Sequence, residues 1–185
     1  MRRILRRYES VMHGNYFKMS LLYGIVMGVA MILILLLRYL CGSKPSSPIS
    51  LWDNISMLVL MVICVLHYRS ILEDKKMTFK EGWLVGFYSG CIAAILFGMF
   101  MYLYSNGIDK EMTLRCANIL RQIPEYASYT NDQIAQMSKP STIALYSIIY
   151  NIVMAILWAF LVGIILKNEN AKQLMKTKQK DNTQK

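Results

Sequence analysis

The sequence predicts an all-α integral membrane protein with four transmembrane helices and a short helical cap in its long extracytoplasmic loop. Hydrophobic residues make up 55% of the 185-residue chain, whereas an average soluble domain holds about 45–50% even with glycine counted. The hydrophobic residues are gathered into long uncharged runs, and the charged residues lie at the ends of those runs. This distribution is typical of helices that cross a bilayer.

Four runs are long enough to cross a membrane, since about 20 residues cover a ~30 Å hydrocarbon core. We expect the spans at about residues 19–40, 49–68, 79–104 and 141–166. The first run follows a long charged leader and precedes no small-x-small cleavage site, so we expect it to stay as a helix.

The distribution of basic residues predicts the orientation. Six of the 21 Lys and Arg residues fall on one side of the expected spans, and the other fifteen fall on the side of the two termini. Cytoplasmic loops carry the excess of positive charge, so we expect an inner-membrane protein with both termini cytoplasmic. The six residues on the other side are Arg38, Lys44, Lys110, Arg115, Arg121 and Lys139.

Three parts of the chain follow from this division. Residues 1–18 form a basic leader, residues 19–167 the membrane domain, and residues 168–185 a lysine- and glutamine-rich tail that we expect to be disordered in the cytoplasm. The leader has apolar residues at helical spacing, which predicts an amphipathic helix on anionic lipid head groups. The alternative is a solvated leader that only fixes topology. The net charge of +10 does not indicate nucleic-acid binding, because the charges flank the spans.

The outer loop, residues 105–140, is predicted to fold into two short helices. Apolar residues from Met112 to Ile123 recur on one helical face, and Pro124 then ends the first helix. Thr130 and Gln133 have the spacing of a capping box, which marks the start of a second helix.

The stretch TFKEGWLVGFYSG opens the third span with a charged pair. Thr78 and Glu81 have capping-box spacing, so we expect their side chains to cap the helix N-terminus. The Glu81 carboxylate would also face the positive end of the helix dipole. Ser50 and Asp53 repeat this spacing before the second span. These polar residues therefore need no ligand to explain them.

Small residues recur every four positions in three spans, which predicts close helix packing. Such ridges imply a tight bundle, self-association, or both. The predicted packing residues are Gly24 and Gly28 in the first span, Gly82, Gly86, Gly90, Ala94 and Gly98 in the third, and Ala155, Ala159 and Gly163 in the fourth.

Side chains that could perform chemistry are sparse. No Asp, Glu, Lys or Arg lies in the middle of a span, and two isolated histidines have no metal-binding spacing. We therefore expect no metal, no cofactor and no catalytic residue. Asn151 is predicted to hydrogen-bond between helices, and the alternative is a polar substrate site with Ser89 and Tyr88. Cys41 and Cys116 fall in the two outer connections, where they would be either a disulfide or two free thiols.

The chain resembles a family of short bacterial membrane proteins with no assigned activity, domain of unknown function family 4199. The resemblance rests on the basic leader running into YGIVMGVAMILI, on KKMTFKEGWLVGFYSG, on TNDQIAQM and on the final apolar span with its lysine tail. It covers about residues 15 to 168. It implies an integral inner-membrane protein of about four helices and supplies no catalytic or binding residues.

These observations favour a structural or accessory protein that packs with itself or with a larger membrane complex. One alternative is a small oligomeric transporter or channel lined by the few polar residues of the spans. Another is a membrane enzyme that acts at the cytoplasmic face through Lys80, Glu81 and His67, although no motif places a nucleophile beside a base.

Overall fold

The computed structural model describes residues 2–44, 51–72 and 77–167, with side chains from residue 17 onward. A π-helical turn, Tyr104–Ile108, continues the third helix, and a 3₁₀ turn, Pro124–Tyr126, follows the fourth. The helices are α1 (Arg2–Leu40), α2 (Leu51–Ile71), α3 (Phe79–Leu103), α4 (Met112–Gln122), α5 (Asn131–Met137) and α6 (Pro140–Leu166).

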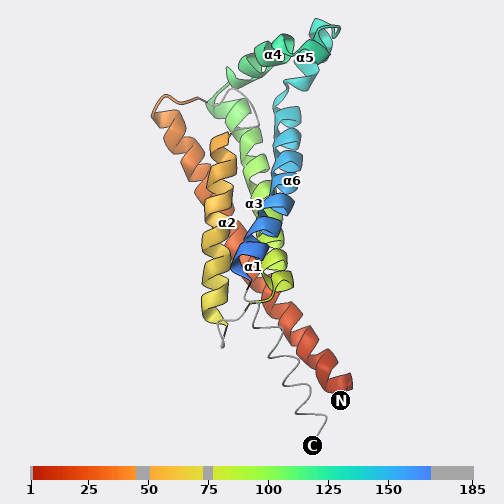
Figure 1. The fold of residues 1–185 in the computed structure, drawn as a ribbon. Coiled ribbons are helices and arrows are strands. Elements are labelled where there is room, and N and C mark those ends of the chain that lie inside the picture. Colours follow the sequence, from red (N-terminus) through yellow and green to blue (C-terminus); the bar gives the residue numbers. More distant parts are fainter. Residues whose placement is uncertain (1, 45–50, 73–76, 168–185) are drawn as a thin grey trace, which may run out of the picture.

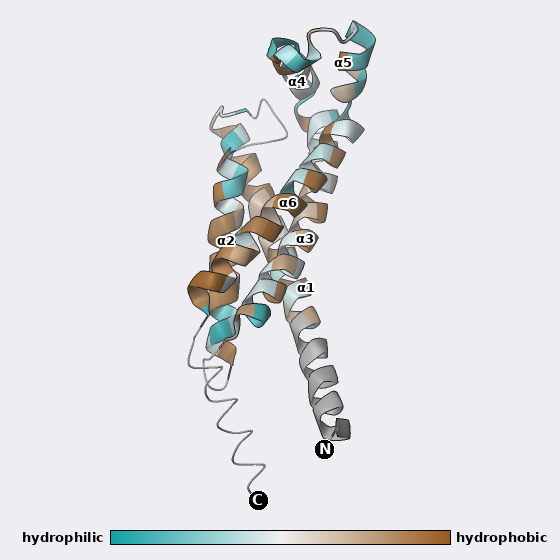
Figure 2. Ribbon diagram, turned by 45° about the vertical axis from the view of Figure 1, so that its right-hand side comes forward, coloured by the Kyte–Doolittle hydropathy of each residue, from teal (hydrophilic) through white to brown (hydrophobic). Residues whose placement is uncertain are grey.

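Four of these helices are long and apolar enough to cross a membrane, which confirms the predicted fold class. The segments that meet this criterion are Phe17–Leu40, Leu51–Ile71, Phe79–Ile108 and Pro140–Leu166. Hydrophilic residues gather on α4, on α5 and at the ends of the long helices (Figure 2). A chain with this distribution buries its apolar helix surfaces in lipid and keeps its polar groups near water.

Helix α3 lies at the centre of the bundle and packs most extensively against α6 and α1. Helix α2 lies to one side and makes smaller contacts with α1, α3 and α6. Figure 1 shows α1 beginning and α6 ending at the same end of the bundle, with α4 and α5 at the opposite end. The two short helices of the outer loop are therefore present, and they cover the end where α3 stops and α6 starts.

The buried core is rich in methionine, because an unbranched thioether fills irregular gaps between helices. Met57 and Met61 extend from α2 toward α3, and both their methyl carbons lie close to Gly90. Neither side chain is exposed. The fully or almost fully buried methionines are Met27, Met31, Met57, Met61, Met77, Met101 and Met112.

Two helices begin with capping boxes, at the two places where the sequence has that spacing and both residues are described. The Thr78 amide donates to the Glu81 carboxylate at 2.7 Å, and the Glu81 amide donates to the Thr78 hydroxyl at 3.3 Å. In the second box, the Thr130 amide donates to the Gln133 side-chain oxygen at 2.8 Å. Each box satisfies amides that the first helical turn leaves without partners. Ser50 lies outside the described residues.

Candidate functional site

The small residues of α3 face the small residues of α6 along one continuous seam. A β-carbon built on Gly90 would lie 2.6 Å from the Ala155 Cβ, and one built on Gly86 would lie 3.2 Å from the Ala159 Cβ. One built on Gly82 would lie 3.5 Å from the Gly163 Cα. The two backbones therefore approach each other as closely as their side chains allow.

A second seam joins α1 to the neighbouring face of α3. A β-carbon on Gly24 would lie 2.9 Å from the Ser89 carbonyl oxygen, and one on Gly28 would lie 3.3 Å from the Ala93 Cα. All ten residues that the sequence marks for helix packing are buried within the single chain. The small-residue surfaces of α1, α3 and α6 are thus occupied by one another.

In the described part of the chain, the three residues of the predicted polar site each contact groups other than one another. Asn151 is buried, and its amide nitrogen donates to the Ser147 carbonyl of its own helix at 2.8 Å, while its Oδ1 has no partner. The Ser89 hydroxyl likewise donates to Val85 of its own helix. Tyr88 is partly exposed and packs edge-on against Phe17.

The enzyme alternative relies on Lys80, Glu81 and His67. Two of these residues have local hydrogen-bond partners. The Glu81 carboxylate accepts the capping hydrogen bond described above. His67 lies on α2, where its Nδ1 is 2.8 Å from the Tyr23 hydroxyl of α1. Lys80 is exposed. Glu81 and His67 are thus each held by a contact that stabilises the helix bundle.

Two arginine–carboxylate pairs lie at the opposite end of the bundle. Arg38, in the last turn of α1, contacts Asp53, in the first turn of α2, at 3.0 Å, and both side chains are largely buried. Each charge complements the dipole of its own helix end. Asp53, which the sequence suggested as a cap for α2, therefore fastens α2 to α1.

The second pair lies where α3 ends. Asp109 is buried and follows the π-helical turn; it accepts hydrogen bonds from the Tyr104 hydroxyl, at 3.0 Å, and from Arg115 of α4. The Tyr39 ring of α1 packs edge-on against the Tyr104 ring. The weaker pair Lys44–Glu111, at 3.6 Å, extends this network to the end of α1. We call these residues, with Arg38 and Asp53, the outer polar network.

The charged members of the outer polar network are paired with opposite charges, so the network joins α1 to α2 and α4 to the end of α3. This network was not predicted from the sequence, in which Arg38 and Arg115 indicated only the topology. The available signal was the position of Asp53 and Asp109 directly beside the ends of apolar runs. Among the described residues, no group of three or more His, Cys, Asp or Glu side chains could hold a metal ion.

None of the four cysteines, all of which lie in the described part of the chain, forms a disulfide. Cys41 is exposed at the end of α1, whereas Cys116 is buried on α4. Burial raises the pKa of the Cys116 thiol to about 11, although the nearby Arg115 opposes this shift. Since the thiolate is the nucleophile, Cys116 is unreactive at neutral pH.

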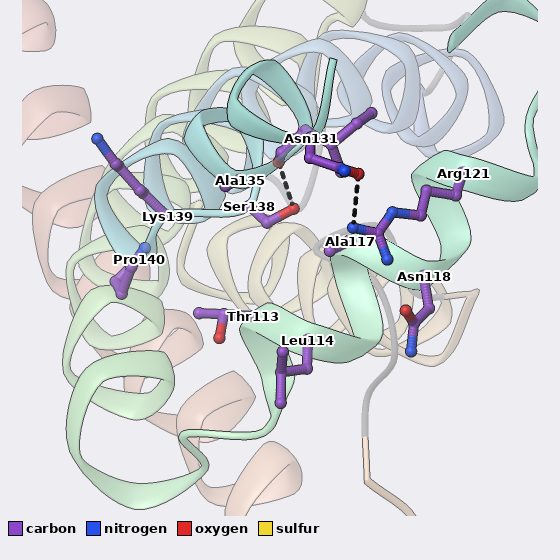
Figure 3. Close-up of a pocket in the computed structure, with 11 residues that line it drawn as sticks. Thr113, Leu114, Ala117, Asn118, Arg121, Asn131, Ala135, Ser138, Lys139 and Pro140 are labelled. Atoms are coloured by element: carbon purple, nitrogen blue, oxygen red, sulfur yellow. Dashed lines mark hydrogen bonds between the residues drawn. The ribbon is translucent and has the colours of Figure 1, made fainter. Parts of the chain in front are cut away.

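A pocket opens between α4, α5 and the start of α6 (Figure 3). The Arg121 guanidinium closes one side of it by donating to the Asn131 Oδ1 at 3.1 Å. No sequence pattern predicts this pocket, because it forms only when the two short helices pack against each other. Its lining residues are Thr113, Leu114, Ala117, Asn118, Arg121, Asn131, Ile134, Ala135, Ser138, Lys139 and Pro140.

Four long apolar helices, three of which pack through small residues, and two short helices at one end of the bundle define a multi-pass helical membrane protein. The chain belongs to the family DUF4199, described as a protein of unknown function, whose profile matches residues 22–168. The resemblance noted in the sequence is thereby confirmed. No curated protein and no solved structure matches the chain.

Proposed function

We propose that the protein is an accessory component of the inner membrane, which binds a larger membrane complex or further copies of itself. The observation that supports this proposal is the direct contact of α3 with α6, as at Gly86 and Ala159. Helices in such contact leave no room between them for a water-filled path. A bundle whose central helices are in direct contact favours a role that the lipid-facing surface performs.

A partner would meet the lipid-facing side chains, since the small-residue ridges are already used inside the chain. Helix α2 has the smaller interhelical contacts and exposes a stripe of apolar side chains along its length. A partner helix is about as apolar as the lipid that it would replace on α2. Binding to this stripe would therefore depend on shape and close packing. The exposed members of the stripe include Ile55, Val59 and Ile63.

The proposed orientation puts both termini in the cytoplasm and α4 and α5 outside, following the excess of basic residues near the termini. The basic leader would then contact anionic head groups of the inner leaflet. Its backbone is helical and continuous with the first span, because α1 begins at Arg2.

Site-specific photo-crosslinking in the native membrane tests the proposal. A photoreactive residue at Ile63, exposed on α2, should yield discrete protein adducts, and the same residue at Met61, buried two positions earlier, should yield none. Adducts to lipid alone, from Ile63 and from equivalent exposed positions on the other spans, would argue against a protein partner. An oligomeric transporter and an enzyme at the cytoplasmic face are the alternatives, and two variants below separate them from this proposal.

A further inference from the structure

We propose that the pocket between α4, α5 and the start of α6 binds a phosphate ester. This ester is either the head group of an anionic phospholipid or a soluble phosphate monoester. The inference does not rest on the accessory role proposed above, since it concerns a different part of the molecule. The pocket has a volume of about 340 Å³, which lies at the lower end of the ~300–1,000 Å³ typical of small-molecule sites.

The charge of the lining favours an anion. Arg121 of α4 and Lys139, which directly precedes α6, lie on opposite sides of the pocket, with the Lys139 ammonium at the rim and directed away from the centre (Figure 3), and no carboxylate is among the lining residues. The Arg121 guanidinium uses one bond to Asn131. A guanidinium carries five N–H donors, so others remain for phosphate oxygens, with which arginine pairs well.

The remaining lining suits the polar head and the short carbon stem of an ester. Asn118 and Asn131 add amide groups, and the Asn131 amide nitrogen can donate because its Oδ1 already accepts from Arg121. Leu114, Ala135 and Pro140 supply apolar surface. The pocket adjoins the first residue of the α6 span, where the phosphate groups of a bilayer would lie.

Three variants of the full chain test the proposal in maltoside micelles, which contain no phosphate. The double variant Arg121→Gln/Lys139→Gln removes the charges, and Ala135→Leu fills the pocket while keeping them. Lys110→Gln is the control, because Lys110 is an exposed cation of the same loop that does not line the pocket. Equal melting temperatures establish that each variant is folded.

One arm of the experiment titrates sn-glycerol 3-phosphate by calorimetry, and the other measures retained phosphatidylglycerol by native mass spectrometry. We expect binding in at least one arm, weakened about tenfold or more by the double variant and by Ala135→Leu and unchanged by Lys110→Gln. Binding in the lipid arm alone identifies a head-group site, and binding in the soluble arm identifies a phosphate-ester site. Absence of binding in both arms overturns the proposal, as does equal weakening by Lys110→Gln or indifference to Ala135→Leu.

Discussion

Gly90 of α3 lies directly against Ala155 of α6, so that a β-carbon built on Gly90 would be 2.6 Å from the Ala155 Cβ. Met57 and Met61 of α2 close over the same glycine, at 3.3 and 3.1 Å from that position. One residue of α3 thus forms the meeting point of three helices. Its missing side chain is what lets α2 and α6 both reach the central helix.

The glycines of α3 should differ in their tolerance of alanine. Gly90→Ala pushes against the Ala155 Cβ, which can move only with its backbone, so we expect a loss of about 1–3 kcal/mol. Gly82→Ala meets first the flexible methyl end of Met77, at 2.8 Å, and should cost less. Thermal unfolding in detergent measures the difference.

Gly107→Ala provides the matched control, because a β-carbon there meets nothing within 4 Å. Its unfolding temperature should equal or exceed that of the wild type. Equal stability of the Gly90 and Gly107 variants would contradict the close approach of α3 and α6.

Replacing Asp109 should weaken the attachment of α4 to the bundle. Asp109→Asn leaves Arg115 without its nearest charge partner and replaces one acceptor oxygen by an amide. Loss of one partner from a fully buried pair costs roughly 3–5 kcal/mol. Because Glu111 also lies 3.5 Å from Arg115, we expect a smaller loss of about 2–3 kcal/mol, measured by chemical denaturation.

Lys44→Gln is the comparison for this variant, since Lys44 and Glu111 form a more exposed pair. Exposed pairs contribute about 0–1 kcal/mol. A loss after Lys44→Gln as large as that after Asp109→Asn would mean that burial does not set the strength of the outer polar network.

The two outer cysteines should react differently with a membrane-impermeant maleimide applied to intact cells. Cys41 is exposed, so we expect labelling if that end of the bundle faces outward. Cys116 should stay unlabelled at neutral pH, because its thiol is buried and burial raises its pKa to about 11. Labelling detected by mass shift tests burial and orientation together.

The raised pKa of the Cys116 thiol also predicts how the stability of the protein changes with pH. Its folded-state pKa lies above the usual value near 8.5, so its contribution to stability is complete below pH ~8.5 and is lost as pH rises toward about 11. Cys116→Ser should flatten this alkaline loss. An unchanged alkaline profile would show that other groups cause it.

The capping box at the start of α3 should affect stability alone. Thr78→Ala removes the acceptor of the Glu81 amide and should cost about 0.5–2 kcal/mol, and Glu81→Gln should cost no more, because an amide oxygen can still accept. Thr130→Ala, in the second capping box, is the control, because its partner Gln133 is uncharged where Glu81 carries a carboxylate. A Glu81→Gln chain that folds normally but fails to complement a deletion strain would instead support the enzyme alternative.

Thiol labelling of a cysteine at position 151 distinguishes the accessory role from transport. The Asn151 side chain is 1% exposed and lies in the fourth span, so Asn151→Cys should resist small water-soluble thiol reagents. Cysteine at the exposed loop residue Ser128 is the positive control. Labelling of position 151 at a rate near that of position 128 would indicate a water-filled path and support the transporter alternative.

The sequence predicts the four spans, the two outer helices and both described capping boxes because each depends on local residues. Run length decides whether a segment crosses a bilayer, and Thr78 and Glu81 lie within one helical turn of each other. Small-residue spacing also marks which side of α3 meets α6, as Gly86 illustrates, although α3 is apolar all round.

The outer polar network and the pocket could not be predicted in the same way. Arg38 finds Asp53, and Tyr104 packs on Tyr39, only because neighbouring helices take particular rotations about their axes. A helix that is hydrophobic on every side carries no pattern that fixes this rotation. The π-helical turn before Asp109 adds a further local shift that residue spacing does not reveal.

The methionines that fill the core make the chain sensitive to oxidants before the helices pack together. Once folded, Met57 and Met61 have no exposed surface, so dissolved peroxide cannot reach their thioethers. A newly made chain has no such protection, and a sulfoxide is polar and chiral where Gly90 requires an apolar methyl group. We therefore expect oxidation of Met57 or Met61 to disturb the packing of α2 on α3 only when it precedes folding.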